Sequence, residues 1–192
     1  MNVPYWILSV GSFLRSIPAP GKTTLPIAKN SWGYTEGNHF KTPYELICNL
    51  IDVVSKNGCL MLNVGPKADG TICDEEAHAA GNRKMDEEKR RGDLRHLTLP
   101  DFGEGPSNSG GSFREKLTFT KKDFRFTYRP GELYVFAMKP NAKNVYRIKS
   151  LGARDDALNY DIRGVSLVGM MQSKLPPDGQ LFRAARGDSR AI

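Results

Sequence analysis

The chain has 192 residues, a formal net charge of +7 and three cysteines. This length allows one ordinary domain or two small ones, and it is too short for a complete eight-stranded β/α barrel of about 250 residues. The basic residues are scattered, and their densest run, residues 83–95, is interleaved with acidic residues and lacks aromatic partners. Nucleic-acid-binding surfaces combine basic side chains with aromatic stacking platforms, so no nucleic-acid partner is expected.

The cysteines and histidines give no sign of metal chemistry. Cys48, Cys59 and Cys73 and the three histidines lie too far apart in the sequence for a zinc motif, so we expect neither a metal site nor a cofactor. Cys48 and Cys59 are expected to be buried apolar residues. The apolar run at residues 5–10 lacks the flanks of a signal peptide, and no segment is long enough to span a membrane.

The first forty residues are weakly patterned. Pro18, Pro20 and Pro26 break any helix, so little regular structure is expected in residues 1–30. The aromatic segment SWGY at residues 31–34 and a polar loop to Lys41 follow.

The sequence pattern of residues 42–58 predicts a helix. Thr42 is a suitable N-cap, Pro43 suits the first helical position, and Glu45 completes a capping box. One apolar stripe follows helical spacing: Ile47, Leu50, Ile51 and Val54. The Asn57-Gly58 pair favours a left-handed end to this helix.

Residues 59–64 are nearly all apolar and directly follow this helix. They predict a strand buried on both faces, as in a parallel sheet. Gly65-Pro66 ends the strand, and residues 67–70 form a turn. In a β/α barrel, the loop after such a strand lies on the active-site face. Residues 74–88 favour a helix but show no apolar stripe.

The character of the chain changes after residue 101. Residues 102–112 are expected to form a linker or long loop. Short alternating runs then occupy residues 122–128, 132–138 and 144–150, with turn residues at Pro130-Gly131 and Pro140-Asn141. This pattern is typical of an antiparallel meander in a β-sandwich.

Four segments resemble family 29 glycoside hydrolases, the α-L-fucosidases, in the same order. SWGY at residues 31–34 resembles an active-site segment, and DVVSKNGCLMLNVGPKADGTI at residues 52–72 resembles the last barrel strand and its loop. FGEGP at residues 102–106 resembles the entry to the C-terminal domain, and residues 119–138 resemble the first hairpin of that domain. The long second motif makes the resemblance specific.

The resemblance implies an α/β plus β fold: the C-terminal portion of a (β/α)8-type barrel followed by part of an antiparallel β-sandwich. Residues 1–100 would be the barrel fragment, with 80–100 degenerate, and residues 101–192 the start of the sandwich. The implied activity is retaining hydrolysis of terminal α-L-fucosyl bonds, with a fucosylated glycan as substrate. A non-catalytic carbohydrate-binding or interaction module built on the sandwich is the alternative.

The resemblance implies that no residue of this chain is catalytic. In the family, the nucleophilic Asp and the acid/base Glu precede the SWGY segment, so the chain alone is expected to be inactive. Four carboxylates are present in the regions considered, and each is better explained by a structural position. Glu36 lies in a loop, Glu45 in a helix cap, Asp69 in a turn and Glu104 in a linker.

One substrate contact follows from the resemblance. Trp32 resembles the family's aromatic residue that lines the pocket for the fucose methyl group, and a core aromatic is the alternative interpretation. Asn63 ends its strand where barrel enzymes place functional side chains. Such an asparagine more often ties down the following loop, and we do not predict it to be a ligand.

Residues 80–100 depart from the family. The family's final helix reads like IGKWLKVNGEAIYGTRPW here, whereas this chain reads GNRKMDEEKRRGDLRHLTLP at residues 81–100. Codons for Asn82 to Asp86 can be chosen so that, read one nucleotide later, they spell Ile-Gly-Lys-Trp. Codon degeneracy is the alternative explanation, but any Met-Asp pair gives that Trp. With allowed codons, the shifted reading continues to match the family's sequence as far as His96. The sequence therefore indicates a frameshifted segment at about residues 81–98, which is expected to pack weakly and to leave the preceding strand partly uncovered.

Overall fold

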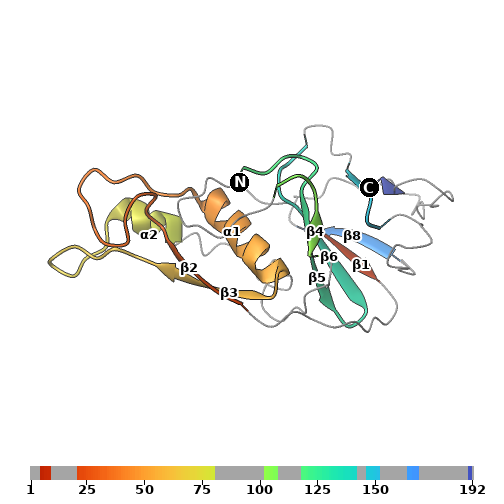
Figure 1. Ribbon diagram of the computed structural model, residues 1–192, viewed down its shortest axis with the longest axis horizontal. Helices are drawn as coiled ribbons and strands as arrows, with labels where there is room; N and C mark the ends of the chain where they lie inside the picture. Colours follow the sequence, from red (N-terminus) through yellow and green to blue (C-terminus); the bar gives the residue numbers. More distant parts are fainter. Residues whose placement is uncertain are drawn as a thin grey trace.

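The computed structural model describes residues 5–9, 21–80, 102–107, 118–141, 146–151, 164–168 and 190–191. Within these residues, a parallel strand pair occupies one end of the molecule and an antiparallel sheet the other, with helix α1 between them (Figure 1). The predicted out-of-frame segment at residues 81–98 lies outside the described residues. None of the described helices has the length and apolar character needed to cross a bilayer.

The parallel end is a βαβ unit made of β2 (Gly21–Pro26), α1 (Pro43–Ser55) and β3 (Gly58–Asn63). Strands β2 and β3 run parallel, with Gly21 opposite Gly58 and Pro26 opposite Asn63. Helix α2 (Asp74–Ala80) follows. The predicted strand is confirmed, but the expectation of little structure before residue 30 is wrong. Pro26 is compatible with β2 because β2 is an edge strand of a two-stranded sheet, where a missing N–H need not break the ladder.

Helix α1 begins as its capping residues predict. The Thr42 hydroxyl accepts a hydrogen bond from the Glu45 N–H at 3.2 Å, and the Glu45 carboxylate accepts from the Thr42 N–H at 2.7 Å. The helix ends at Ser55, earlier than the predicted residue 58. Asn57 then takes a positive φ of 61°, which turns the chain directly into β3.

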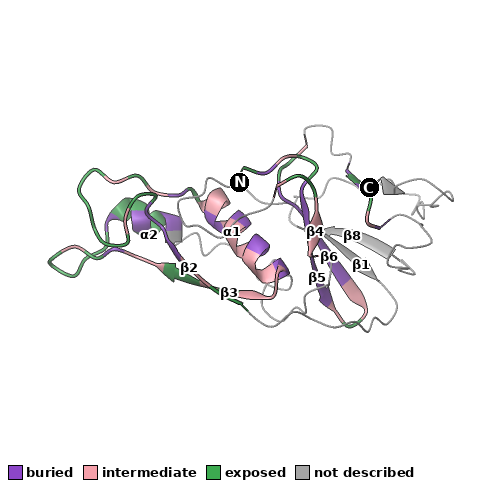
Figure 2. Cartoon of the chain, in the orientation of Figure 1, coloured by how far each residue is buried: buried purple, intermediate pink, exposed green. Residues whose placement is uncertain are grey.

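Helix α1 is buried on two sides rather than along the single predicted stripe. Leu46 packs with Leu25, Ile27 and Ala79 at the parallel end. Cys48 and Ile51 pack instead against side chains of the antiparallel end, namely Phe119, Tyr134, Phe136 and Met138. Figure 2 shows buried residues along the helix where it lies between the two ends. The helix is therefore the shared core element of the molecule.

The antiparallel sheet has the strand order β4-β5-β6-β1-β8. Its strands are β4 (Gly103–Glu104), β5 (Phe124–Arg129), β6 (Glu132–Ala137), β1 (Tyr5–Ser9) and β8 (Gly164–Val168). A separate small ladder pairs β7 (Arg147–Ile148) with β9 (Arg190–Ala191). The predicted strands near residues 122–128 and 132–138 are confirmed as β5 and β6, and the one at 144–150 corresponds to the shorter β7.

Two segments pair with this sheet against expectation. Gly103 and Glu104, predicted to lie in a linker, form the edge strand β4 against β5. Residues 5–9 form β1, which pairs antiparallel with both β6 and β8. Strand β1 therefore joins the antiparallel sheet although it precedes the predicted domain boundary at residue 100. Both errors have one cause, because pairing partners distant in the sequence leave no local pattern.

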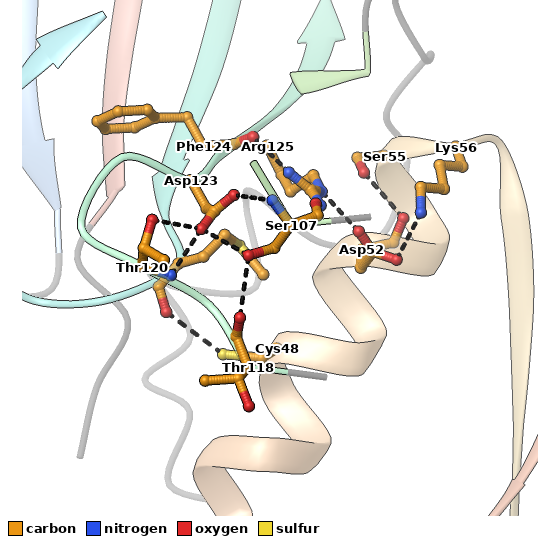
Figure 3. A network of polar contacts seen from close by, with 11 residues as sticks. Cys48, Asp52, Ser55, Lys56, Ser107, Thr118, Thr120, Asp123, Phe124 and Arg125 are labelled. Atoms are coloured by element: carbon orange, nitrogen blue, oxygen red, sulfur yellow. Dashed lines mark hydrogen bonds and ion pairs between the residues drawn. The ribbon is translucent and has the colours of Figure 1, made fainter. Parts of the chain in front are cut away.

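A buried ion pair joins α1 to the antiparallel sheet (Figure 3). Arg125 of β5 donates from Nε to Asp52 Oδ1 of α1 at 2.5 Å, and both side chains are nearly inaccessible to solvent. The other guanidinium nitrogens donate to the carbonyls of Phe124 and Ser107, at 2.9 and 2.8 Å. Asp52 Oδ2 accepts from Lys56 at 2.8 Å. Each Arg125 nitrogen thus has an acceptor, which a buried charge requires.

Side chains around this pair tie down the neighbouring loops. The Asp123 carboxylate accepts hydrogen bonds from the backbone and hydroxyl groups of Ser107 and Thr120, at 2.6–2.9 Å. Burial raises the pKa of Asp123, but these hydrogen bonds outweigh burial and hold the pKa below its ordinary value. The Met138 carbonyl accepts from the Tyr44 hydroxyl and from the Cys48 thiol of α1. Burial raises the pKa of Cys48 to about 12, so this thiol keeps its proton.

Strand β3 is more exposed than its apolar sequence predicts. Leu60 packs against the cluster beside α1, but Leu62 on the same face is 39% exposed. Cys59 and Met61 occupy the face away from α1, and both are exposed, Met61 by 56%. The expectations of a strand buried on both faces and of a buried Cys59 are therefore wrong, whereas Cys48 is buried. On the α1-facing side, only the exposure of Leu62 is consistent with the expectation that this strand is left partly uncovered.

The ion pair generates a stability prediction. The substitution Asp52→Leu should reduce the free energy of unfolding by about 3–5 kcal/mol, because it leaves the Arg125 charge buried and unpaired. Adding Arg125→Met should recover most of that loss, since a well-packed apolar pair commonly replaces a buried ion pair without cost. Urea unfolding followed by circular dichroism measures both changes.

The control is Lys56→Met, which removes the partly exposed partner of Asp52 and should cost no more than about 1 kcal/mol. A double variant no more stable than Asp52→Leu would show that the unpaired charge is not the origin of the loss.

Candidate functional site

The candidate site lies where β2 and β3 end, because both strands point their carboxyl ends in the same direction. The loop after β2, residues 27–42, closes on itself at its base. Ala28 forms an isolated antiparallel bridge with Phe40, and the backbone of Lys29 bonds to that of His39 at 2.8 Å. The loop therefore projects from a narrow neck and carries the SWGY segment at its outer part.

Side chains inside this loop hold its tip around Ser31. The Ser31 hydroxyl donates to the Gly33 carbonyl, and it accepts from Thr35 Oγ1 and Asn38 Nδ2, each at 3.2 Å. The Asn38 side-chain oxygen Oδ1 in turn accepts from the His39 N–H at 2.8 Å. These contacts give the polar loop a defined shape although it contains no helix or strand.

The loop after β3 is ordered by a turn and by one buried carboxylate. Lys67 and Thr71 bond through their backbones at 2.8 Å, and Asp69 accepts from the backbone and hydroxyl of Thr71. Asp69 thus has the turn role that the sequence predicts. Glu76, buried on α2, accepts the N–H of Gly65 at 3.0 Å. Helix α2 therefore anchors the first residues of this loop.

The two loops touch at consecutive residues of the SWGY segment. Asn63 Nδ2 donates to the Trp32 carbonyl at 2.6 Å. A Cβ atom on Gly65 would lie 2.7 Å from both the Gly33 carbonyl carbon and the Tyr34 nitrogen, so only glycine allows this approach. The Lys67 ammonium also lies 5.8 Å from the centre of the Tyr34 ring. The end of β3 thus holds the segment by its backbone.

The aromatic side chains of this segment face solvent. Trp32 is 41% exposed and Tyr34 is 44% exposed, so Trp32 is not a core aromatic. Asn63 shares the β3 face of Cys59 and Met61, away from α1, because side chains alternate along a strand. An exposed aromatic pair therefore lies next to a strand face that is also exposed.

Lys41 supports the neck of the loop from within. Its ammonium donates to the Pro26 and Ala28 carbonyls at 2.7 and 3.0 Å, in a buried position. Burial lowers the pKa of Lys41, and the nearby Glu45 carboxylate partly opposes that shift. The carbonyls of Pro26, the last residue of β2, and of Ala28 beyond it thus receive a charged donor.

Three of the four carboxylates considered from the sequence accept hydrogen bonds from backbone groups: Glu45, Asp69 and Glu104. Glu36 is exposed in the loop, and Glu45 caps α1. Glu104 accepts from the backbone N–H groups of Lys149 and Ser150, which gives it a structural role in β4 rather than in a linker. In the described part of the chain, no cluster of three or more histidine, cysteine or acidic side chains could hold a metal ion.

The sequence did not point to Glu76 or to the Asn63–Trp32 contact. A second glutamate after the helix-starting Asp74 is ordinary in a first turn, so it gave no signal. Asn63 and Trp32 lie 31 residues apart. The position of Asn63 at the end of an apolar strand was the one signal in the sequence. It suggested a structural contact but did not identify Trp32 as the partner.

Comparison with a family model identifies the segment that forms this site. Residues 16–82 match the model of the alpha-L-fucosidase family. The chain is α-L-fucosidase-like. The match contains β2, α1, β3 and α2 with both loops, and it ends close to residue 81, where the sequence predicts the departure from the family pattern.

Solved α-L-fucosidase structures resemble this chain over part of their length. An α-L-fucosidase is 25% identical, with a TM-score of 0.53, over 73% of this chain and 30% of that one. α-L-Fucosidase isoenzyme 1 from Paenibacillus thiaminolyticus, at 18% identity and a TM-score of 0.51, covers 91% of this chain and 39% of its own. Thermotoga maritima α-fucosidase in complex with fucose is 27% identical, with a TM-score of 0.49, over 62% of this chain and 26% of that one.

The chain therefore spans well under half the length of these α-L-fucosidases, and the shared fold is established over that partial length. A search among curated proteins gave no match.

The role of Lys41 predicts a specific pH dependence. Lys41→Met should cost about 1–3 kcal/mol at neutral pH, because two buried carbonyls lose their donor. The unfolded lysine keeps its proton up to its ordinary pKa of 10.5, whereas the folded one loses it at lower pH. The unfolded state binds more protons in that window, so the Lys41 contribution to stability should rise with pH up to 10.5.

Unfolding free energies of the parent and Lys41→Met, measured by urea titration between pH 7 and 10.5, should therefore diverge as the pH increases. Lys22→Met, an equivalent change on the exposed start of β2, should give a constant difference close to zero. A Lys41→Met difference that shrinks with increasing pH would contradict the assignment.

Proposed function

We propose that this chain is part of an α-L-fucosidase, a retaining exo-glycosidase that hydrolyses terminal α-L-fucosyl bonds of glycans, and that it supplies one wall of the fucose pocket. The exposed Trp32, held at the carboxyl end of two parallel strands within the family match, carries this proposal. Barrel enzymes place their active sites at the carboxyl ends of the strands.

The chemistry of Trp32 suits the sugar. L-Fucose carries a methyl group where L-galactose carries a hydroxymethyl group, so its ring has an apolar end. An aromatic face gains from contact with that methyl group and pays no cost for an unpaired hydroxyl. Tyr34 lies in the same exposed segment and extends the aromatic surface.

The barrel and sandwich assignments belong to the same proposal. Strands β2 and β3 with α1 and α2 would be the end of a (β/α)8-type barrel, and the sheet containing β5 and β6 would be the start of the C-terminal sandwich. The parallel and antiparallel pairings support the two parts. The face of β3 away from α1 would then line the barrel interior, since helices cover the outside of such barrels.

The chemical step requires two catalytic carboxyl groups for which this chain has no matching positions. A retaining glycosidase uses one carboxylate to attack the anomeric carbon and a second carboxyl group to protonate the leaving oxygen and then activate water. The resemblance places both upstream of SWGY. Glu45, Asp69 and Glu104 are occupied by backbone contacts, which supports the proposal that the chain alone is inactive.

The proposal predicts no hydrolysis by this chain. Purified alone, it should not release 4-nitrophenol from 4-nitrophenyl α-L-fucoside above the spontaneous rate, because loss of catalytic groups costs several powers of ten in rate. The absorbance of the released phenol measures this. Turnover comparable to that of a complete α-L-fucosidase would place the catalytic carboxylates in this chain and overturn the assignment.

Sugar binding tests the role of Trp32 directly. L-Fucose should bind more tightly than L-galactose by about fourfold, since one buried methyl group is worth roughly 0.8 kcal/mol. Trp32→Ala should abolish that preference, and Trp32→Phe should retain most of it. Ligand-observed NMR titrations with both sugars measure the dissociation constants.

This experiment also separates the proposal from its alternative. A carbohydrate-binding module built on the antiparallel sheet would bind sugar independently of Trp32. A preference for L-fucose that survives Trp32→Ala would therefore favour that module.

A further inference from the structure

We infer that Asn63 is a positioning residue that sets the orientation of the Trp32 side chain toward the sugar. This inference rests on the proposed function, because it concerns the same pocket. It assigns a specific role to a side chain that the sequence alone identifies only as a loop-tethering candidate.

The first observation is the location of the contact. Asn63 Nδ2 donates to the carbonyl of Trp32 at 2.6 Å, so it holds the peptide unit to which the indole is attached. The Ser31 hydroxyl donates to the next carbonyl, that of Gly33. The orientations of two successive carbonyls in the SWGY segment are thereby fixed. A side chain of β3 binds the first, and a side chain of the loop itself binds the second.

The second observation is that contacts from β3 and its loop fall on three consecutive residues. Asn63 contacts Trp32, and Gly65 lies against the backbone of Gly33 and Tyr34. Gly65 is itself held by the Glu76 carboxylate of α2. The segment is therefore fixed by its backbone against an ordered support, and a single misplaced peptide unit would rotate the side chain attached to it.

The third observation is that Trp32 and Tyr34 remain substantially exposed despite these backbone contacts. A loop that served only to cover the core would bury its large aromatic residues, because burial is what stabilises them. A backbone tethered at the end of a strand with its aromatic side chains exposed is instead arranged to present those side chains. Rigid presentation reduces the ordering cost of binding.

The test uses the full chain with Trp6→Phe, which leaves Trp32 as the single tryptophan. Asn63→Asp preserves the size of the side chain but replaces the donor with a carboxylate, which repels the Trp32 carbonyl. We expect a red-shifted Trp32 emission, stronger quenching by acrylamide, and L-fucose affinity reduced by about fivefold, the worth of one hydrogen bond. The midpoint of thermal unfolding should change little, because this contact lies at the surface.

Two further variants sharpen the result. Asn30→Asp makes the same chemical change at an exposed position of the same loop and should leave emission and affinity as in the parent. Gly65→Ala displaces the same segment by a steric route, since its Cβ would collide with Gly33 and Tyr34. It should reproduce the Asn63→Asp emission shift and the loss of L-fucose affinity.

The outcomes separate the inference from the proposed function. Unchanged Trp32 emission in Asn63→Asp overturns the inference, and so does a changed emission with unchanged L-fucose affinity. A parent chain that binds L-fucose with an affinity unaffected by Trp32→Ala overturns the proposed role of Trp32. In that case the emission of Asn63→Asp still reports whether Asn63 orients the segment, but a role in sugar recognition is rejected.

Discussion

The buried pair of Asp52 and Arg125 is the interaction on which the arrangement of the two ends depends. Removing two charges from water is costly, and the pair is tolerable here because its polar atoms are satisfied. The Arg125 guanidinium carbon also lies 5.3 Å from the centre of the Phe102 ring and 5.4 Å from that of Phe119. We expect this directional pair to favour one orientation of α1 on the sheet, a role that buried ion pairs have in some proteins.

That orientation reaches the candidate site through a short path. Asp52 lies on the last turn of α1, and Asn57 turns the chain into β3, which ends at Asn63. A rotation of α1 would therefore move the strand whose end holds the Trp32 backbone. The antiparallel sheet thus supports the site mechanically, by fixing the helix that precedes β3, which gives a physical reason for the two parts to share a core.

Local signals in the sequence were sufficient for α1, β3, β5 and β6. The capping box, the Asn57 turn and the Pro130-Gly131 hairpin each act within a few residues, and local chemistry decides them. Strands β1 and β2 escaped prediction because their stability comes from partners distant in the sequence. The same holds for the Arg125–Asp52 pair, 73 residues apart, and for Asn63 and Trp32. The family resemblance indicated the candidate site, but it could not supply these contacts.

Strand β3 retains a conflict between its sequence and its surroundings. Its residues are those of a strand covered on both faces, yet Cys59 and Met61 are exposed on one face and Leu62 on the other. Conflicts of this kind concentrate at functional or incompletely covered surfaces. Parallel strands are normally covered on both sides, and the conflict disappears if β2 and β3 belong to a larger parallel sheet. The proposed barrel meets that requirement, because its interior would cover Met61 while leaving Asn63 and Trp32 at the open carboxyl end.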